Sequence, residues 1–122
     1  MMNVLVVDDS PTIRTLLELA LDNVGYTVFQ AGNAEEAVVM IKEKGPFPLG
    51  IFDVNMPGKS GIELIQEVLS MQGSENMKIV VLTTESSEEM KKAGKDSGAK
   101  AWLLKPFEED SLMKVINKLA SM

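Results

Sequence analysis

The sequence predicts an α/β fold in which five parallel strands form one sheet with helices on both faces. Two observations predict it. Short runs of strand-forming residues alternate with longer segments whose apolar residues keep the spacing of an amphipathic helix. Three of the five runs are almost wholly apolar, which is typical of parallel strands buried on both faces. Because each strand is followed by a helix, the connections are expected to be the right-handed crossovers of a doubly wound sheet.

The first strand is expected at residues 3–7, where four apolar residues follow Asn3. Ser10 and Pro11 then open a helix, because serine is a preferred N-cap and proline fits the first helical position. Gly25 is expected to end this helix. Its apolar stripe consists of Ile13, Leu16, Leu17, Ala20, Leu21 and Val24.

A second strand at 26–30 leads to a second helix. Asn33 opens this helix, and Glu36 follows three residues later in the arrangement of a capping box. Its inner stripe consists of Ala37, Val38 and Ile41. The loop 44–48 ends the helix, and the third strand is the short apolar run that ends at Phe52.

The third helix opens at Ser60 with Glu63, and its inner stripe consists of Ile62, Ile65, Val68 and Leu69. A strand at 78–83, a helix at about 87–97 and a strand at 100–104 follow. This fourth helix is the weakest, since Met90 and Ala93 are almost its only apolar residues and Gly98 ends it. The last helix is defined by Leu112, Val115, Ile116 and Leu119.

The three most apolar strands are expected at the centre of the sheet, which gives the flavodoxin-like strand order 2-1-3-4-5. In this order the C-terminal ends of the first and third strands flank the crossover switch point, where open α/β sheets bind their ligands. Asp8 and Asp9 end the first of these strands and Asp53 ends the second. We therefore expect the three carboxylates to converge, with Thr83 and Lys105 at the ends of the next two strands.

This cluster of residues is expected to accept a phosphoryl group. Crowded carboxylates repel one another unless a cation lies among them. Oxygen ligands without histidine or cysteine favour a hard cation, and Mg²⁺, which keeps several waters, suits a shallow site. Mg²⁺ and Lys105 would neutralise the phosphoryl oxygens while a carboxylate attacks in line. Asp53 is the expected acceptor, because the adjacent Asp8 and Asp9 are better placed to hold the metal.

Composition narrows the function further. The 122 residues fit one domain. Histidine is absent, which excludes histidine-based catalysis and a phosphohistidine carrier, and the absence of cysteine excludes disulfides and thiolate metal sites. The net charge of −6 argues against nucleic-acid binding. The N-terminal residues resemble neither a signal peptide nor a membrane span, so we expect a cytoplasmic protein.

The sequence resembles response-regulator receiver domains over essentially its whole length. The matching segments are Val6-Val7-Asp8-Asp9-Ser10, Asp53-Val54-Asn55-Met56-Pro57-Gly58, Thr83-Thr84-Glu85 and Lys105-Pro106-Phe107. The resemblance implies that residues 1–122 form a single receiver domain without an output domain. It implies that a histidine kinase of a two-component system phosphorylates Asp53. Mg²⁺ would be bound by Asp9, Asp53 and the Asn55 backbone carbonyl, while Asp8 would act mainly through metal-bound water.

The same resemblance assigns roles to the residues at the last two strand ends. Thr83 would supply the hydroxyl that moves toward the phosphoryl group, and Lys105 would be the ion-pair partner of that group. The Lys105–Pro106 peptide bond is expected to be cis. The protein would be a regulatory phosphoprotein, not an enzyme, that catalyses only its own phosphoryl transfer and dephosphorylation.

Within this family the sequence is most similar to the CheY-type single-domain regulators of chemotaxis and flagellar rotation. Asn55 and Glu85, each two residues beyond Asp53 and Thr83, match the residue types that these proteins place around the attacking water. This match implies rapid loss of the phosphoryl group. The implied partners are a CheA-like histidine kinase, a FliM-like flagellar motor switch protein and a phosphatase, and the chain is expected to be a monomer.

One residue departs from the CheY-type pattern, because Trp102 stands where these proteins usually carry a tyrosine that switches rotamer. The indole could exchange between exposed and buried positions when Thr83 moves, or it could be only a half-buried residue of an edge strand. The output face is expected on the fourth helix, the fifth strand and the fifth helix. Lysines gather there around Trp102 and would suit an acidic peptide with an apolar anchor, although a merely solvated face is an alternative. They are Lys91, Lys92, Lys95 and Lys100.

Three other functions remain open from the sequence. A stand-alone receiver could serve another circuit, as a phosphorelay intermediate or in pilus or developmental control. A haloacid-dehalogenase-like, Mg²⁺-dependent phosphatase also uses an aspartate nucleophile, but it requires Asp-x-Asp after the first strand, where Asp9 is followed by Ser10 and Pro11. A flavodoxin-like FMN binder requires a hydroxyl-rich loop at that place, where Asp8 and Asp9 would repel the phosphate.

Overall fold

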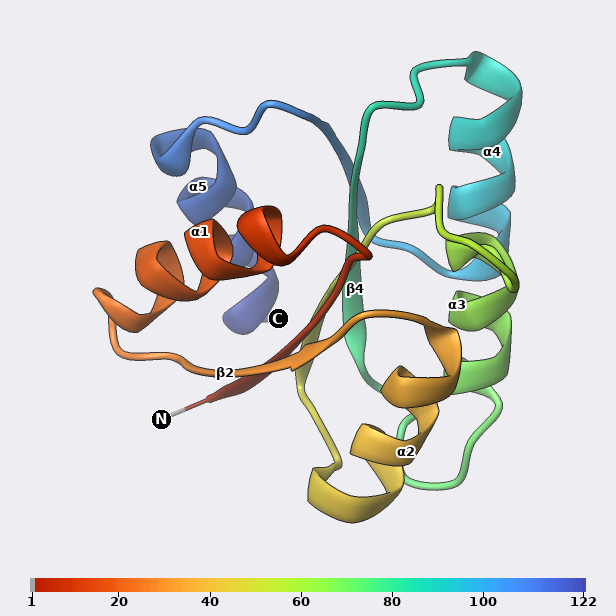
Figure 1. The fold of residues 1–122 in the computed structure, drawn as a ribbon, viewed down its shortest axis with the longest axis horizontal. Coiled ribbons are helices and arrows are strands. Elements are labelled where there is room, and N and C mark those ends of the chain that lie inside the picture. Colours follow the sequence, from red (N-terminus) through yellow and green to blue (C-terminus); the bar gives the residue numbers. More distant parts are fainter. Residues whose placement is uncertain (1) are drawn as a thin grey trace.

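The computed structural model describes residues 2–122. Its five strands are β1 (Asn3–Val7), β2 (Thr27–Ala31), β3 (Leu49–Phe52), β4 (Lys78–Thr83) and β5 (Ala101–Leu104). The helices are α1 (Pro11–Asp22), α2 (Ala34–Lys44), α3 (Gly61–Leu69), α4 (Glu88–Ser97) and α5 (Glu109–Ala120). All strand pairs are parallel, and the order β2-β1-β3-β4-β5 confirms the predicted fold class. Helices α1 and α5 cover one face of the sheet and α2, α3 and α4 cover the other (Figure 1).

Side chains of the central strands alternate between two hydrophobic cores. Leu5 and Val7 point into the core under α2 and α3, whereas Val4 and Val6 point into the core under α1 and α5. All four are fully buried, as are most residues of β3 and β4. Double-sided burial is the reason that these strands are continuous apolar runs, and it confirms their predicted central position.

The predicted starts of two strands differ from the structure by one residue, and two residues assigned to the apolar stripe of the first helix are exposed. Strand β2 begins at Thr27 instead of 26, and β5 begins at Ala101 instead of 100. In the first helix, Leu16 is 47% exposed, and Val24 lies beyond the end of α1 and is 54% exposed. The prediction assigned both to the apolar stripe of a helix ending at Gly25. The sheet covers only part of that stripe at Leu16, and α1 ends at Asp22 with Asn23 as its C-cap, before Val24.

Two predictions for α2 and α3 need correction, one for the start of α2 and one for the buried side of α3. Asn33 caps α2 as predicted, but the Glu36 carboxylate accepts from the Gly32 amide instead of completing a capping box with Asn33. In α3, Leu64 is fully buried although it was left out of the predicted stripe, whereas Ile62 and Leu69 are only partly buried. None of the described helices is long and apolar enough to span a membrane.

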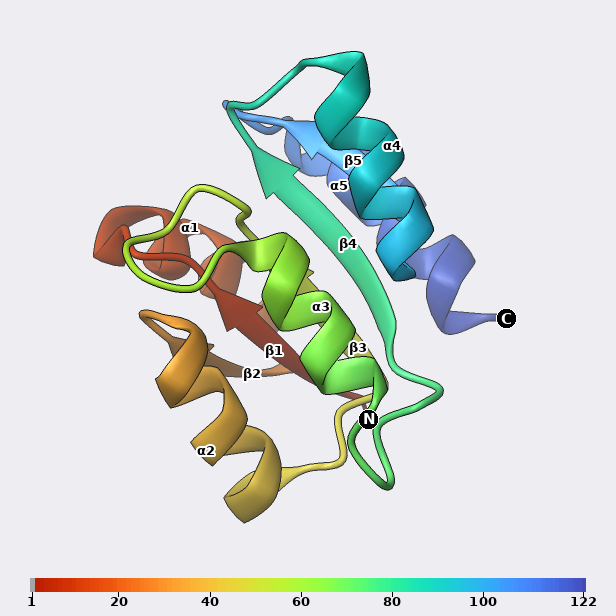
Figure 2. The same ribbon diagram turned by 90° about the vertical axis from the view of Figure 1, so that its right-hand side faces the viewer.

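Helix α4 has the poorest apolar face of the helices in residues 2–122, as the sequence predicts. Its one buried residue is Gly94, and Met90 and Ala93 are only partly buried. The helix is nevertheless well delimited, because the Ser87 side chain accepts from the Met90 amide at the start and Gly98, with φ at +118°, follows the end. Helix α4 lies beside α3 on the same face of the sheet (Figure 2).

Candidate functional site at the C-terminal edge of the sheet

Three carboxylates converge where β1 and β3 end. Asp8, Asp9 and Asp53 each offer one oxygen, and these three oxygens lie within 4.8 Å of one another. Asp8 and Asp53 are buried, with 2% and 4% of their surface exposed, while Asp9 is exposed to solvent. The parallel pairing of Val7 with Phe52 brings the following residues together at the same edge, as the topology predicts.

Lys105 lies directly against this cluster. Its Nζ is 2.8 Å from Asp8 Oδ2 and 2.8 Å from Asp53 Oδ2. Burial lowers the pKa of the Lys105 ammonium, but the hydrogen bonds to Asp53 and Asp8 and the negative charges of these carboxylates together outweigh this effect, so that the pKa lies above its ordinary value. The ammonium is therefore charged at neutral pH and offsets part of the repulsion between the two buried carboxylates. The Lys105–Pro106 peptide bond is cis, as the family resemblance implies.

Backbone amides orient both buried carboxylates. The Ser10 amide donates to Asp8 Oδ1 at 2.9 Å, and the Asn55 amide donates to Asp53 Oδ1 at 3.0 Å. One oxygen of each carboxylate thus accepts a hydrogen bond from a backbone amide, and the other forms an ion pair with Lys105. These contacts restrain the orientation of both side chains, which favours in-line attack by one of them.

The hydroxyl of Thr83 forms the next part of the site. Thr83 is fully buried at the end of β4, and its Oγ1 accepts from the Glu85 amide at 3.3 Å and from Asn55 Nδ2 at 3.5 Å. The carbonyl of Glu85 in turn accepts from Trp102 Nε1 at 2.9 Å. The structure therefore connects Asn55, Thr83, Glu85 and Trp102 through hydrogen bonds.

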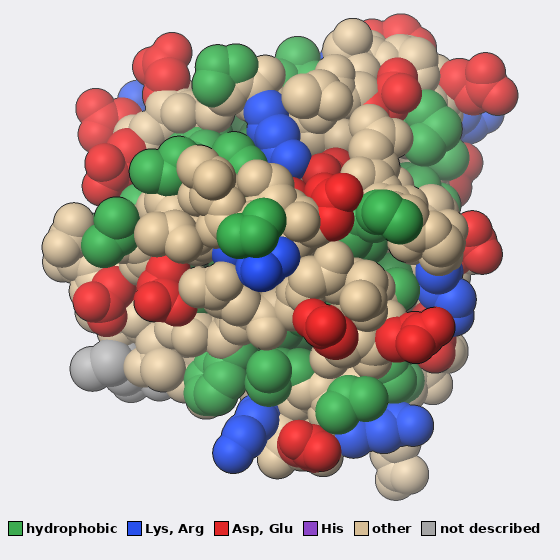
Figure 3. Space-filling model, viewed as in Figure 1, with side chains coloured by type: hydrophobic (Ala, Val, Ile, Leu, Met, Phe, Trp, Pro, Cys, Tyr) green, Lys and Arg blue, Asp and Glu red, His purple; other side chains and the backbone are tan. Residues whose placement is uncertain are grey.

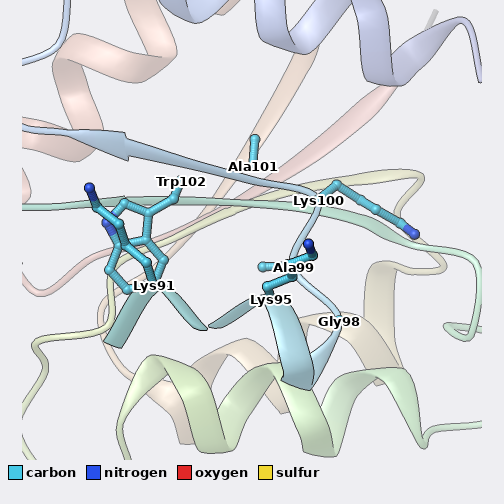
Figure 4. A pocket seen from close by; sticks show the side chains of 7 residues that line it. All are labelled: Lys91, Lys95, Gly98, Ala99, Lys100, Ala101 and Trp102. Atoms are coloured by element: carbon cyan, nitrogen blue, oxygen red, sulfur yellow. The ribbon is translucent and has the colours of Figure 1, made fainter. Parts of the chain in front are cut away.

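The predicted partner face forms a groove between α4 and β5, with a volume of about 470 Å³. It is lined by Lys91, Lys95, Gly98, Ala99, Lys100, Ala101 and Trp102 (Figure 4). Of the four predicted lysines, Lys92 is exposed but does not line the groove. Trp102 is half-buried, and Lys91 makes a 3.7 Å ion pair with Glu88 on its own helix.

The donor set of the acid cluster fits a small hard cation. All side-chain ligand atoms in the cluster are carboxylate oxygens, and Asp9, which is exposed, leaves one side of the cluster open to solvent. Oxygens around one Mg²⁺ lie at most about 4.2 Å apart, given ligand distances near 2.1 Å. The 4.8 Å spread of the cluster therefore needs only small side-chain rotations to hold the ion. Asp8, Asp9 and Asp53 could supply carboxylate ligands.

Two residues of the site escaped prediction from the sequence. Arg14, the single arginine of the chain, donates to the Asp8 carbonyl at 2.6 Å and to Gln30 Oε1 at 3.0 Å. Gly61 lies so close to the acceptor strand that a Cβ atom there would be 2.2 Å from the Asp53 carbonyl oxygen. The sequence could have indicated Arg14, because it is a lone arginine one turn into the helix that follows Asp8 and Asp9. No residue pattern around Gly61 indicates its contact with the Asp53 carbonyl.

On the face in Figure 3 acidic and basic side chains are interspersed.

The strand order and the site define a doubly wound α/β protein with a carboxylate–lysine site at its switch point. Residues 4–117 match the response regulator receiver domain family, so the chain belongs to this family of two-component signalling proteins.

Known receiver proteins resemble this chain along nearly its whole length. Protein PilH of Pseudomonas aeruginosa is 32% identical over 117 residues, which cover 96% of each chain. The solved structure of chemotaxis protein CheY4 of Vibrio cholerae is 39% identical, with a TM-score of 0.92 and 98% coverage of both chains. Response regulator TrrA of Thermotoga maritima, solved with Mg²⁺–BeF, is 35% identical, with a TM-score of 0.85 and coverage of 98% of this chain and 99% of that one. The chain is thus a CheY-like receiver, as the sequence motifs predict.

Proposed function

We propose that this protein is switched by phosphorylation of Asp53. The observation that carries the proposal is the setting of this carboxylate, which is buried, fixed by the Asn55 amide and Lys105, and adjacent to Asp8 and Asp9. A histidine kinase would supply the group. An Asp53 oxygen forms the new bond to phosphorus as the phosphorus–nitrogen bond of the phosphohistidine breaks, and the released imidazole takes up a proton.

Mg²⁺ would be held by Asp9 and Asp53 directly and by Asp8 through water, with the Asn55 backbone carbonyl as a further ligand. When bound, the ion neutralises the phosphoryl oxygens. Lys105 already lies 2.8 Å from Asp53 Oδ2 and would pair with one of these oxygens. Thr83 would supply a hydroxyl donor, and Asn55 and Glu85 would tune the approach of the water that removes the group.

Among circuits, we propose chemotaxis, in which the protein acts as a cytoplasmic monomer. A CheA-like kinase would load it and a FliM-like motor switch protein would read it, with a phosphatase as a further partner. The resemblance to CheY4 over 98% of both chains supports this circuit. The groove beside Trp102, with Lys91, Lys95 and Lys100 around it, suits an acidic peptide with an apolar anchor.

A receiver circuit other than chemotaxis stays open, because the similarity to protein PilH is almost as extensive as the similarity to CheY4. The acid cluster and Lys105 would do the same chemistry in any receiver circuit. Receivers of different circuits bind different partners, and the groove is the proposed partner site. Binding of an acidic, Phe-anchored peptide to the beryllofluoride-treated protein therefore distinguishes the chemotaxis circuit from another receiver circuit. Affinity that rises at least tenfold on treatment supports the motor-type output, and unchanged weak binding favours another circuit.

The phosphorylation itself is tested by intact mass after incubation with acetyl phosphate and Mg²⁺. We expect a single phosphoryl adduct in the native chain, lost when Mg²⁺ is removed and lost in Asp53→Asn. Asp22→Asn, which removes a carboxylate at the end of α1, is the matched control and should keep the adduct. An adduct that persists in Asp53→Asn, or its absence in a native chain that binds beryllofluoride, would refute the assignment.

A further inference from the structure

The indole of Trp102 packs directly on the backbone of helix α4. A Cβ atom built at Gly94 would lie 2.6 Å from Trp102 Cζ3 and 2.9 Å from Cε3. Both neighbours are atoms of a rigid aromatic ring, so the overlap can be relieved only if the whole ring leaves its position. Gly94 is also the one buried residue of α4. The ring therefore occupies the volume that any other residue at position 94 would need.

The backbone conformation gives no separate reason for glycine at position 94. Gly94 lies inside α4 with ordinary helical geometry, unlike Gly98, which has φ at +118°. Glycine is the least favourable residue after proline in a helix interior, because its unfolded state is the most flexible. Close approach of the indole is thus the one structural demand at this position that requires glycine.

The opposite edge of the same ring is held by a hydrogen bond. Trp102 Nε1 donates to the Glu85 carbonyl at 2.9 Å, and the Glu85 amide donates to Thr83 Oγ1 at 3.3 Å. The ring thus spans from α4 to the segment that follows β4. Trp102 therefore contacts α4 at Gly94, lines the groove, and is hydrogen-bonded to the Glu85 carbonyl.

We propose that Gly94 is the positioning residue for Trp102, and that the two residues form a matched pair that shapes the groove between α4 and β5. With glycine at position 94 the indole lies inward, bound to the Glu85 carbonyl, and forms one side of the groove beside Lys91 (Figure 4). A methyl group at position 94 displaces the ring toward the groove and breaks its bond to Glu85. That this groove binds a partner rests on the proposed function, whereas the pairing of Gly94 with Trp102 does not.

The pairing is tested by a double-mutant cycle of thermal unfolding with Gly94→Ala, Trp102→Ala and the double variant, without any phosphoryl donor. In the Trp102→Ala background, Gly94→Ala removes a helix glycine without a clash and should raise the Tm by about 3–5 °C. In the native background the same substitution should lower the Tm. An equal rise in both backgrounds would overturn the proposal. If Gly94→Ala alone fails to fold, a folded double variant supports the pairing and an unfolded double variant overturns it.

Fluorescence provides the second measurement, since Trp102 is the single tryptophan of the chain. Gly94→Ala should shift the emission maximum to longer wavelength and increase quenching by acrylamide at least twofold. Lys92→Ala, an exposed change on the same helix, is the matched control and should leave both unchanged. Unchanged emission in a folded Gly94→Ala protein would also overturn the proposal. Both measurements use the unphosphorylated protein, so their failure is distinguishable from failure of the phosphorylation at Asp53.

Discussion

Replacement of Lys105 by methionine tests the electrostatic design of the site. Methionine keeps most of the side-chain length but removes the ammonium that lies 2.8 Å from both Asp8 Oδ2 and Asp53 Oδ2. The two carboxylate side chains are only 3% and 5% exposed, so water solvates them poorly once the ammonium is removed. We expect the free energy of unfolding to fall when Mg²⁺ is absent.

The size of the loss follows from the burial of the three groups. Removal of one partner from a buried ion pair typically costs about 3–5 kcal/mol, because the remaining charge stays buried and unpaired. The Lys105 side chain is itself 14% exposed, which places the expected loss at the lower end, near 3 kcal/mol. For a domain of this size, that loss lowers the Tm by roughly 10 °C.

Urea unfolding with EDTA present measures this loss directly. Lys100→Met is the matched control, because Lys100 is an exposed lysine and its replacement should change stability by less than about 0.5 kcal/mol. Mg²⁺ should restore more stability to Lys105→Met than to the native chain, since the cation replaces the missing positive charge. A Lys105→Met protein as stable as the Lys100→Met protein without Mg²⁺ would refute the reasoning.

The pH dependence of the same difference has a definite sign. Burial alone would lower the pKa of Lys105, but the hydrogen bonds to Asp53 and Asp8 and the charges of these carboxylates together raise it in the folded protein. A raised pKa contributes stability that is complete below the unfolded value of about 10.4 and is lost as the pH rises through the folded value. The gap between native and Lys105→Met proteins should therefore stay constant from pH 7 to about 9.5 and close at higher pH.

Three further substitutions test other parts of the site. Asp9→Asn should weaken Mg²⁺ binding about tenfold or more, measured by titration calorimetry, with little change in unfolding because the side chain is exposed. Gly61→Ala should destabilise the fold by about 3 kcal/mol in urea and reduce adduct formation, because its Cβ would press on the Asp53 carbonyl; normal stability would contradict this contact. Arg14→Ala should cost about 1–2 kcal/mol through loss of its bonds to the Asp8 carbonyl and Gln30, and unchanged urea unfolding would contradict it.

The sequence was sufficient to predict the sheet order and the position of the acid cluster. Continuous apolar strands reveal double-sided burial, and a parallel sheet brings the strand ends to one edge. Asp8 and Asp53 are therefore predictable as neighbours from topology alone, whereas Lys105 is predictable only at the same edge of the sheet, two strands away from Asp53. Chemical roles for these residues came from residue types and from the family resemblance, and phosphorylation of Asp53 remains a prediction.

Contacts across the fold were not predictable from the sequence in the same way. The demand for glycine at positions 61 and 94 comes from a backbone and a ring that approach from distant parts of the chain. Neither position has a positive φ or a turn to mark it locally. The exposure of Leu16 likewise depends on how much of α1 the sheet covers, and that of Val24 on the end of α1 at Asp22; helical spacing determines neither.

The hydrogen bonds of Thr83 join the acid cluster to the groove. A phosphoryl group that draws the Thr83 hydroxyl toward Asp53 must compete with the Glu85 amide, which donates to the same oxygen. Any resulting shift of Glu85 moves the carbonyl that accepts from Trp102. Helix α4 opposes such a shift only weakly, because so little of it is buried. Linkage then requires reciprocity: a partner that binds the groove better when Asp53 is phosphorylated must stabilise the phosphorylated form by the same factor.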